Sequence, residues 1–245
     1  MLSFDAFFFD LDGTLIDFNP NEFVKIYLGA AARYFKDLIP DSDYFVKSIL
    51  DSTKVMEMAD TPKKLALYDF FDDFCQKFNP DCSTIIQGFR NFYDTDFNVV
   101  EKIIHPIPHA EKVLLFIRDN YPTSKIVLST NPVFPEVAIV KRLNWGGLSE
   151  NLFDYITHAE NSYYCKGSLN YWIELAKKLN VKPEKTLVIG NDGARDMIAK
   201  KAGFKTYFLI QTAENEHSLE KYPPDYKGSL ESLLDLLNKR KTNKS

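Results

Sequence analysis

The sequence has few cysteines, no long apolar run and no large excess of either charge. Its three cysteines, Cys75, Cys82 and Cys165, show neither a C-x-x-C spacing nor a paired framework. Zinc ribbons and disulfide-rich folds are therefore not expected, and we interpret all three as reduced thiols. No apolar stretch approaches the roughly 20 residues of a membrane span, and no basic leader precedes the first apolar run. We accordingly expect a cytoplasmic protein that does not enter a membrane.

The charge distribution excludes a further class of protein. The net charge is −4, and the lysines and arginines are scattered rather than gathered in a stripe with interleaved aromatic residues. We therefore expect no nucleic-acid partner. A chain of 245 residues can bury a sizeable core, as one large domain or as a domain with an insertion. No feature of the sequence indicates an oligomeric state.

Short apolar runs typical of buried strands alternate with helical patterns over most of the chain. They cover residues 4–9, 126–128, 155–157, 187–189 and 206–209. This alternation predicts an α/β fold, in which a parallel sheet carries helices on both faces. Functional sites in such sheets lie beyond the carboxyl ends of the strands.

The long first interval lacks this alternation. Apolar residues there follow helical spacing over residues 22–35, 44–56, 62–78 and 83–92. Phe70, Phe71, Phe74 and Phe78 repeat at this spacing and are expected to form its core. We therefore expect a helical insertion at 18–104 and an α/β core formed by 1–17 and 105–245, with hinges near 17–21 and 104–109.

Two carboxylates, Asp10 and Asp12, follow the first aromatic strand. Alternate side chains of an extended segment share a face, and Gly13 allows a sharp turn, so both can face one cavity. Burying unpaired carboxylates is costly and each raises the pKa of the other, which favours a bound cation such as Mg²⁺. A strand end with a solvated acid remains the simpler alternative, although it accounts poorly for the whole D-x-D-G-T run.

Two further polar segments follow the same logic. Thr130 and Asn131 come just after the second expected strand, where a hydroxyl and a backbone amide can hold an anionic oxygen. Lys166 precedes the amphipathic stretch 169–179, where its charge can neutralise a nearby carboxylate. Taken singly, they also fit a plain strand-to-turn junction and a solvated lysine.

The last polar segment, G-N-D-G-A-R-D, follows the strand expected at 187–189 and starts a helix expected to run through Ala202. Asp192 and Asp196 are four residues apart, which places them on one side of a first helical turn, where they can complete a metal site. Either acid alone also fits a helix cap.

Residues 9–17, F-D-L-D-G-T-L-I-D, resemble the first motif of the haloacid dehalogenase superfamily. The segments around Thr130, Lys166 and Asp192 resemble its second, third and fourth motifs, in the family's order. Gly167 stands where the family more often has proline, and Asn191 stands where it often has aspartate. The resemblance covers residues 4–209 apart from the insertion. It implies a Rossmann-like core with a helical cap inserted between the first and second motifs.

The resemblance implies that the chain is a Mg²⁺-dependent phosphatase of a small phosphorylated metabolite. Asp10 would attack phosphorus to form an aspartyl phosphate, and Asp12 would act as general acid and base. Thr130 and Lys166 would hold the phosphoryl group. The expected metal ligands are Asp10, the backbone carbonyl of Asp12, and Asp192, with Asn131, Asn191 and Asp196 as possible additional contacts.

Three alternatives accompany this interpretation. Haloacid dehalogenation is disfavoured, because that reaction needs neither Asp12 nor a metal. A phosphosugar mutase shares the core chemistry and is harder to separate from a phosphatase. A catalytically silent binding or regulatory protein on the same fold would need few of the site residues.

Overall fold

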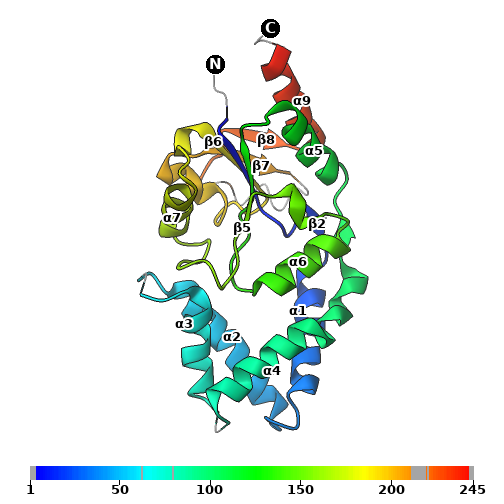
Figure 1. Cartoon of the computed structure of the whole chain (residues 1–245), viewed down its shortest axis with the longest axis vertical. Coiled ribbons are helices and arrows are strands. Elements are labelled where there is room, and N and C mark those ends of the chain that lie inside the picture. Colours follow the sequence, from blue (N-terminus) through cyan, green and yellow to red (C-terminus); the bar gives the residue numbers. More distant parts are fainter. Residues whose placement is uncertain (1–3, 62, 79, 211–218, 220, 243–245) are drawn as a thin grey trace.

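The centre of the molecule is a six-stranded parallel sheet with the order β5-β4-β1-β6-β7-β8 (Figure 1). The computed structural model describes residues 4–61, 63–78, 80–210, 219 and 221–242. The strands are β1 (Ala6–Phe9), β4 (Lys125–Leu128), β5 (Tyr155–Ile156), β6 (Thr186–Gly190), β7 (Lys205–Leu209) and β8 (Tyr226–Gly228). The predicted α/β class is confirmed. Strand β8 was not predicted, because it is partly exposed and contains no apolar run.

Strand β1 is buried on both faces, which explains its run of aromatic residues. Phe7 and Phe9 belong to the core on one face, under α5 (Ala110–Asn120) and α9 (Leu230–Thr242). Phe8 belongs to the opposite core, under α7 (Leu169–Leu179). Because β1 pairs with β4 and β6 on its two sides, a residue that follows it lies at the middle of the sheet edge.

Helices fill the interval between β2 and β3 and gather at the end of the molecule away from both termini (Figure 1). They are α1 (Pro20–Tyr34), α2 (Ser42–Met58), α3 (Ala66–Cys75), α4 (Cys82–Asp94) and the 3₁₀ helix η1 (Asp96–Ile103). The helix predicted at 62–78 is shorter than expected, and Pro62 lies outside the described residues. Phe70, Phe71 and Phe74 are buried as predicted, while Phe78 packs partly buried against the same core.

The chain enters and leaves this helical segment at adjacent points. Strand β2 (Ile16–Asp17) pairs antiparallel with β3 (His105–Pro106), which follows η1. A segment whose two ends meet in this way can be inserted into a core without changing the order of its strands. The helices therefore form a cap between β1 and β4.

The interpretation of all three cysteines as reduced thiols is wrong for two of them. Cys75 ends α3 and Cys82 begins α4, and they form a disulfide with a Cα–Cα distance of 5.3 Å. The turn between the two helices brings these residues together, whereas only Cys165 is free and buried. The pairing removes the cysteine argument for a cytoplasmic location. Among the described helices, none is long and apolar enough to cross a bilayer.

Candidate active site

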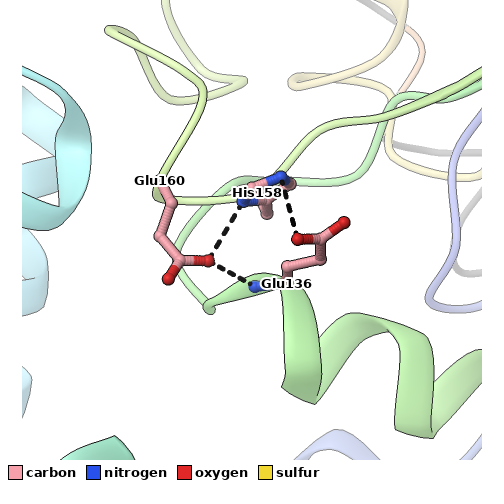
Figure 2. Close-up of side chains that lie close together, drawn as sticks. All are labelled: Glu136, His158 and Glu160. Carbon is pink, nitrogen blue, oxygen red and sulfur yellow. Dashed lines mark hydrogen bonds and ion pairs between the residues drawn. The ribbon is translucent and has the colours of Figure 1, made fainter.

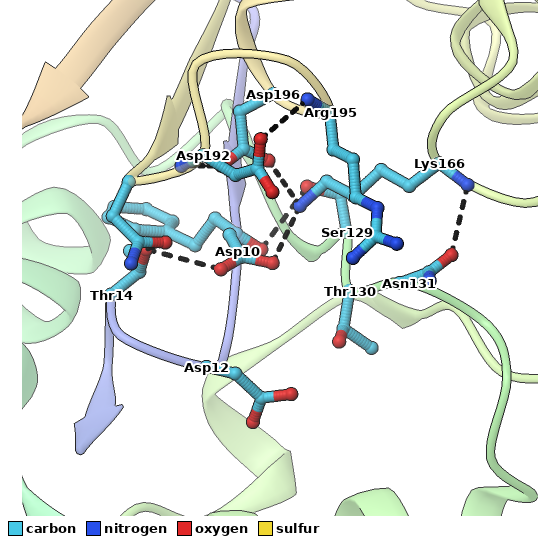
Figure 3. Close-up of polar contacts among 12 residues, drawn as sticks. Asp10, Asp12, Thr14, Ser129, Thr130, Asn131, Lys166, Asp192, Arg195 and Asp196 are labelled. Atoms are coloured by element: carbon cyan, nitrogen blue, oxygen red, sulfur yellow. Dashed lines mark hydrogen bonds and ion pairs between the residues drawn. The ribbon is translucent and has the colours of Figure 1, made fainter. Parts of the chain in front are cut away.

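Asp10 lies directly after β1 and its side chain is buried. Lys166 Nζ donates to Asp10 Oδ1 at 2.6 Å, and Thr14 Oγ1 donates to Asp10 Oδ2 at 3.2 Å (Figure 3). Burial raises the pKa of Asp10 to about 7, and the charge of Lys166 opposes this rise only in part. The site therefore holds a buried carboxylate whose charge Lys166 stabilises only in part.

Lys166 is shared between two buried carboxylates. Its Nζ lies 2.6 Å from Asp10 Oδ1 and 2.5 Å from Asp196 Oδ1, and its side chain is 2% exposed. Burial disfavours the charge of Lys166, but the two carboxylates outweigh that effect and raise its pKa. Burial also raises the pKa of Asp196, against the effect of Lys166. Asp196 thus fixes the lysine that contacts Asp10.

The fourth motif forms a tight turn after β6. Asp192 Oδ1 accepts hydrogen bonds from the backbone N–H groups of Ala194 and Arg195, both at 2.8 Å, and Asp192 N donates to Asp196 Oδ2 at 2.9 Å. The expected helix is instead this turn followed by a 3₁₀ helix, η4 (Met197–Ala202). A Cβ at Gly190 would lie 2.1 Å from the Asp196 carboxylate, so only glycine allows this close packing.

The segment after β4 is fixed by its backbone. The carbonyl oxygen of Thr130 accepts hydrogen bonds from Thr157 Oγ1 at 2.9 Å and from Tyr171 OH at 3.1 Å. Asn131 Oδ1 accepts from the backbone N–H of Lys166 at 3.1 Å. These contacts join the second and third motifs and place Thr130 beside the Asp10 pocket.

Asp12 stands apart from the other carboxylates, and Figure 3 shows its carboxylate turned away from Asp10. Arg142 Nη1 donates to both Asp12 oxygens at 2.8 Å. Arg142 belongs to α6 (Glu136–Trp145), is 1% exposed, and lies over the rings of Phe134 and Phe23, with 4.8 and 5.7 Å from its Cζ to the ring centroids. Its Nε and Nη2 are buried without a hydrogen-bond partner. Asp12 is therefore held at the boundary between the core and the cap.

The sequence reasoning missed two side chains that shape this site, Arg142 and Glu57. Arg142 shares the buried face of α6 with Ala138, Ile139 and Leu143. A cation on an apolar helical stripe is a signal that could have identified it. Glu57, near the end of α2, carried no comparable signal.

Glu57 connects the cap to the core. Its Oε1 accepts hydrogen bonds from Asn131 Nδ2 at 2.9 Å and from Arg195 Nη2 at 3.0 Å. Asn131 follows β4 and Arg195 belongs to the turn after β6, so a single cap carboxylate contacts two motifs. A movement of the cap that displaces Glu57 would therefore also change the contacts of Asn131 and Arg195.

All of the site residues predicted from the sequence line one pocket of about 430 Å³. They are Asp10, Asp12, Thr130, Asn131, Lys166, Asn191, Asp192 and Asp196. Carboxylate and amide oxygens are the donors that Mg²⁺ prefers, and the four carboxylates outnumber the two cationic side chains of the lining, Lys166 and Arg195. The donor set therefore fits a hard divalent cation.

A second cluster of ionisable groups joins Glu136, His158 and Glu160 (Figure 2). His158 Nδ1 lies 3.2 Å from Glu160 Oε2, its Nε2 lies 3.9 Å from Glu136 Oε2, and Glu160 Oε2 accepts from the backbone N–H of Glu136 at 2.9 Å. The cluster ties the first residue of α6 to the segment after β5. Helix α6 also carries Arg142, which contacts Asp12. We therefore assign this cluster the structural role of holding the start of α6 in place.

The parallel sheet, the inserted helices and the acidic pocket at the strand ends define the class of this protein as an α/β protein with a Rossmann-like core and a helical cap. A family model for haloacid dehalogenase-like hydrolases matches residues 4–203. The chain belongs to this family of hydrolases. Among curated proteins, none matches its sequence.

Solved structures share the fold over nearly the whole chain. A putative β-phosphoglucomutase from Thermotoga maritima is 19% identical, with a TM-score of 0.59 over 96% of this chain and 99% of that one. A haloacid dehalogenase-type phosphatase from Thermococcus onnurineus is 16% identical, with a TM-score of 0.59 over 95% and 97%. The L-2-haloacid dehalogenase of Xanthobacter autotrophicus, with chloropropionic acid covalently bound, is 14% identical, with a TM-score of 0.57 over 96% and 98%. At these identities the likeness describes the fold alone.

Proposed function

We propose that the chain is a Mg²⁺-dependent phosphatase that hydrolyses a small phosphorylated metabolite through an aspartyl-phosphate intermediate. The observation that carries the proposal is the pairing of buried Asp10 with Lys166 in a pocket that also contains Asp12. A nucleophilic carboxylate, a cation for the phosphoryl group and a second carboxylate for proton transfer are the parts that such a reaction needs.

The reaction has two displacements at phosphorus. Asp10 attacks, the Asp10–phosphorus bond forms, and the ester P–O bond breaks as Asp12 gives its proton to the leaving oxygen. Asp12 then takes a proton from a water molecule, whose oxygen attacks phosphorus, and inorganic phosphate leaves as the Asp10 carboxylate is restored. Lys166 and Thr130 hold the phosphoryl oxygens throughout.

The residues that would hold Mg²⁺ are Asp10, the backbone carbonyl of Asp12, and Asp192, with Asn131 and Asn191 nearby in the pocket. When bound, the ion supplies positive charge to the phosphoryl oxygens and to the nucleophile. Asp196 faces Lys166 instead, so we assign it the task of positioning that lysine.

The helical cap at 18–104 would control access and proton transfer. Asp12 is paired with Arg142 and turned from Asp10, so it has to rotate toward the phosphoryl group to protonate the leaving oxygen. Closure of a cap excludes water and completes such sites. The hydrogen bonds of Glu57 to Asn131 and Arg195 would hold the cap against the core when it closes.

The test is phosphate release from a panel of phosphate monoesters, with Mg²⁺ or with EDTA. We expect metal-dependent release by the wild type, none by Asp10→Asn, and unchanged release by Asp235→Asn, which alters an exposed aspartate of α9. Activity that survives Asp10→Asn would overturn the proposal. Retention of phosphate on a sugar bisphosphate would identify a mutase, and metal-free cleavage of carbon–halogen bonds would identify a dehalogenase.

A further inference from the structure

A second cavity adjoins the catalytic pocket on the cap side. Its volume is about 500 Å³, which is within the range of small-molecule sites, about 300–1,000 Å³. The two cavities share Asp12, Pro20 and Asn191 as lining residues. A phosphate monoester with its phosphoryl group at Asp10 would therefore direct its alcohol part past Asp12 into this space.

The cap wall of this cavity is apolar. It includes Val24, Ile49, Leu50, Met56, Leu67 and Phe71. Val24 and Leu50 are 44% and 43% exposed, so apolar side chains also reach its solvent side. Apolar surface that is neither buried nor covered by a partner is a common mark of a binding site.

On the cap side of the cavity, the hydroxyl groups of the wall are already engaged. Thr53 Oγ1 donates to the backbone carbonyl of Ile49 at 2.8 Å, and the hydroxyls of Tyr27 and Tyr93 bond to each other at 3.0 Å. Arg142 is the only cationic side chain in the described lining, and its charge faces Asp12. Against this cap wall, a sugar would bury several hydroxyls without partners.

We propose that the preferred substrates are phosphate monoesters whose alcohol part is apolar, and that this cavity seats that part beside Asp12. The inference rests on the proposed phosphatase activity and specifies its substrate class. Selectivity arises because apolar surface leaves water as the alcohol enters, whereas hydroxylated alcohols lose their hydration without replacement.

The test is a series of n-alkyl phosphates from ethyl to octyl, assayed with Mg²⁺ for kcat/KM. Their leaving alcohols have nearly equal acidity, so chain length varies the contact with the cavity and little else. We expect kcat/KM to rise about two- to fourfold per methylene until the cavity is filled, and to exceed that for glucose 6-phosphate. Values independent of chain length, or a preference for the sugar phosphate, would overturn the inference and leave the phosphatase proposal intact.

A matched pair of variants locates the effect. Val24 of α1 and Val55 of α2 are 44% and 45% exposed, but only Val24 lines the cavity. Val24→Asn should lower the ratio of kcat/KM for hexyl to that for ethyl phosphate at least about threefold, and Val55→Asn should not change it. The ratio is independent of the amount of folded enzyme. If the ratio of kcat/KM for hexyl to ethyl phosphate is the same in Val24→Asn as in Val55→Asn, the alkyl chain does not contact Val24. That result would refute the assignment of this cavity.

A binding measurement separates the two proposals. Alkylphosphonates cannot be hydrolysed, so calorimetric titration with ethyl- and hexylphosphonate in Mg²⁺ measures binding without turnover, and the difference between the two ligands reports the cavity. Tighter binding of hexylphosphonate by the wild type, reduced by Val24→Asn, supports the apolar site even if no ester is hydrolysed. Equal affinities for both phosphonates count against it even if hydrolysis occurs.

Discussion

Arg142 Nη1 lies 2.8 Å from each carboxylate oxygen of Asp12, although 130 residues separate them in the chain. The arginine is buried and its position is fixed by α6, whereas the Asp12 side chain is 38% exposed. Both Asp12 oxygens accept from this one cation, and the carboxylate is turned away from Asp10 (Figure 3). Asp12, the proposed general acid, thus points away from Asp10, the proposed nucleophile, and toward the cap.

Asp12→Asn should separate substrates by their leaving groups. General acid catalysis contributes about 10²–10⁴-fold, so kcat/KM for ethyl phosphate should fall by that order. The fall for p-nitrophenyl phosphate should be smaller, because p-nitrophenolate leaves without a proton. The parameter kcat/KM covers steps up to alcohol release, which excludes the later role of Asp12. Equal losses on both esters would contradict proton donation by Asp12, and Asp235→Asn is the control.

Glu57→Ala should loosen the cap. The substitution removes the acceptor of Asn131 Nδ2 and Arg195 Nη2, two contacts between the cap and the core. We expect KM to rise about 3- to 10-fold, since partly exposed hydrogen bonds to a charged group contribute modestly. Hydrogen exchange should quicken at the backbone amides of Ala66 and Leu67, which donate to core carbonyls.

Glu101→Ala is a suitable control for Glu57, because Glu101 is exposed and also belongs to the cap helices. Slower turnover with unchanged exchange would instead assign Glu57 to contact with the substrate.

The Cys75–Cys82 disulfide should stabilise the cap. It closes a short loop with a sequence separation of 7, for which chain entropy gives about 2–3 kcal/mol. The double variant Cys75→Ser, Cys82→Ser should lower the free energy of unfolding in urea by that amount. A reductant should destabilise the wild type and leave the double variant unaffected.

Thiol titration in denaturant without reductant gives an independent check of the disulfide. One reactive thiol per chain, Cys165, is expected, and three would refute the pairing. In the native protein Cys165 should be unreactive, because burial raises its pKa to about 12.

His158 should make the fold less stable in mild acid. Burial lowers its pKa below 6.5, against the opposing charges of Glu136 and Glu160. The unfolded chain therefore takes up a proton more readily than the folded one, and stability falls as pH drops below about 6.5 toward the folded pKa. His158→Gln should reduce this loss between pH 7 and 5.5, measured by urea unfolding. His105→Gln, at an exposed position, should not. The same pH dependence in His158→Gln and wild type would contradict this origin.

Much of the core was predictable because its signals are local. Apolar runs marked β1, β4, β5, β6 and β7, and the polar residues after them fell at one edge of the sheet. The amphipathic stretch 169–179 is α7 with those bounds. Strand β8 and the 3₁₀ form of η4 were not predicted, because a partly exposed strand has no apolar run and a short 3₁₀ segment lacks α-helical periodicity.

The sequence by itself determined the α/β class, the inserted helices and the set of polar residues that meet beyond the strand ends, because periodicity and motif spacing encode them locally. Only the tertiary structure decided how these residues pair: Asp12 with Arg142, Asp196 with Lys166, and Glu57 with Asn131 and Arg195. It also decided the joining of Cys75 to Cys82 and the apolar cavity beside Asp12. Such pairings depend on how distant helices pack over one sheet, and no short stretch of sequence contains that information.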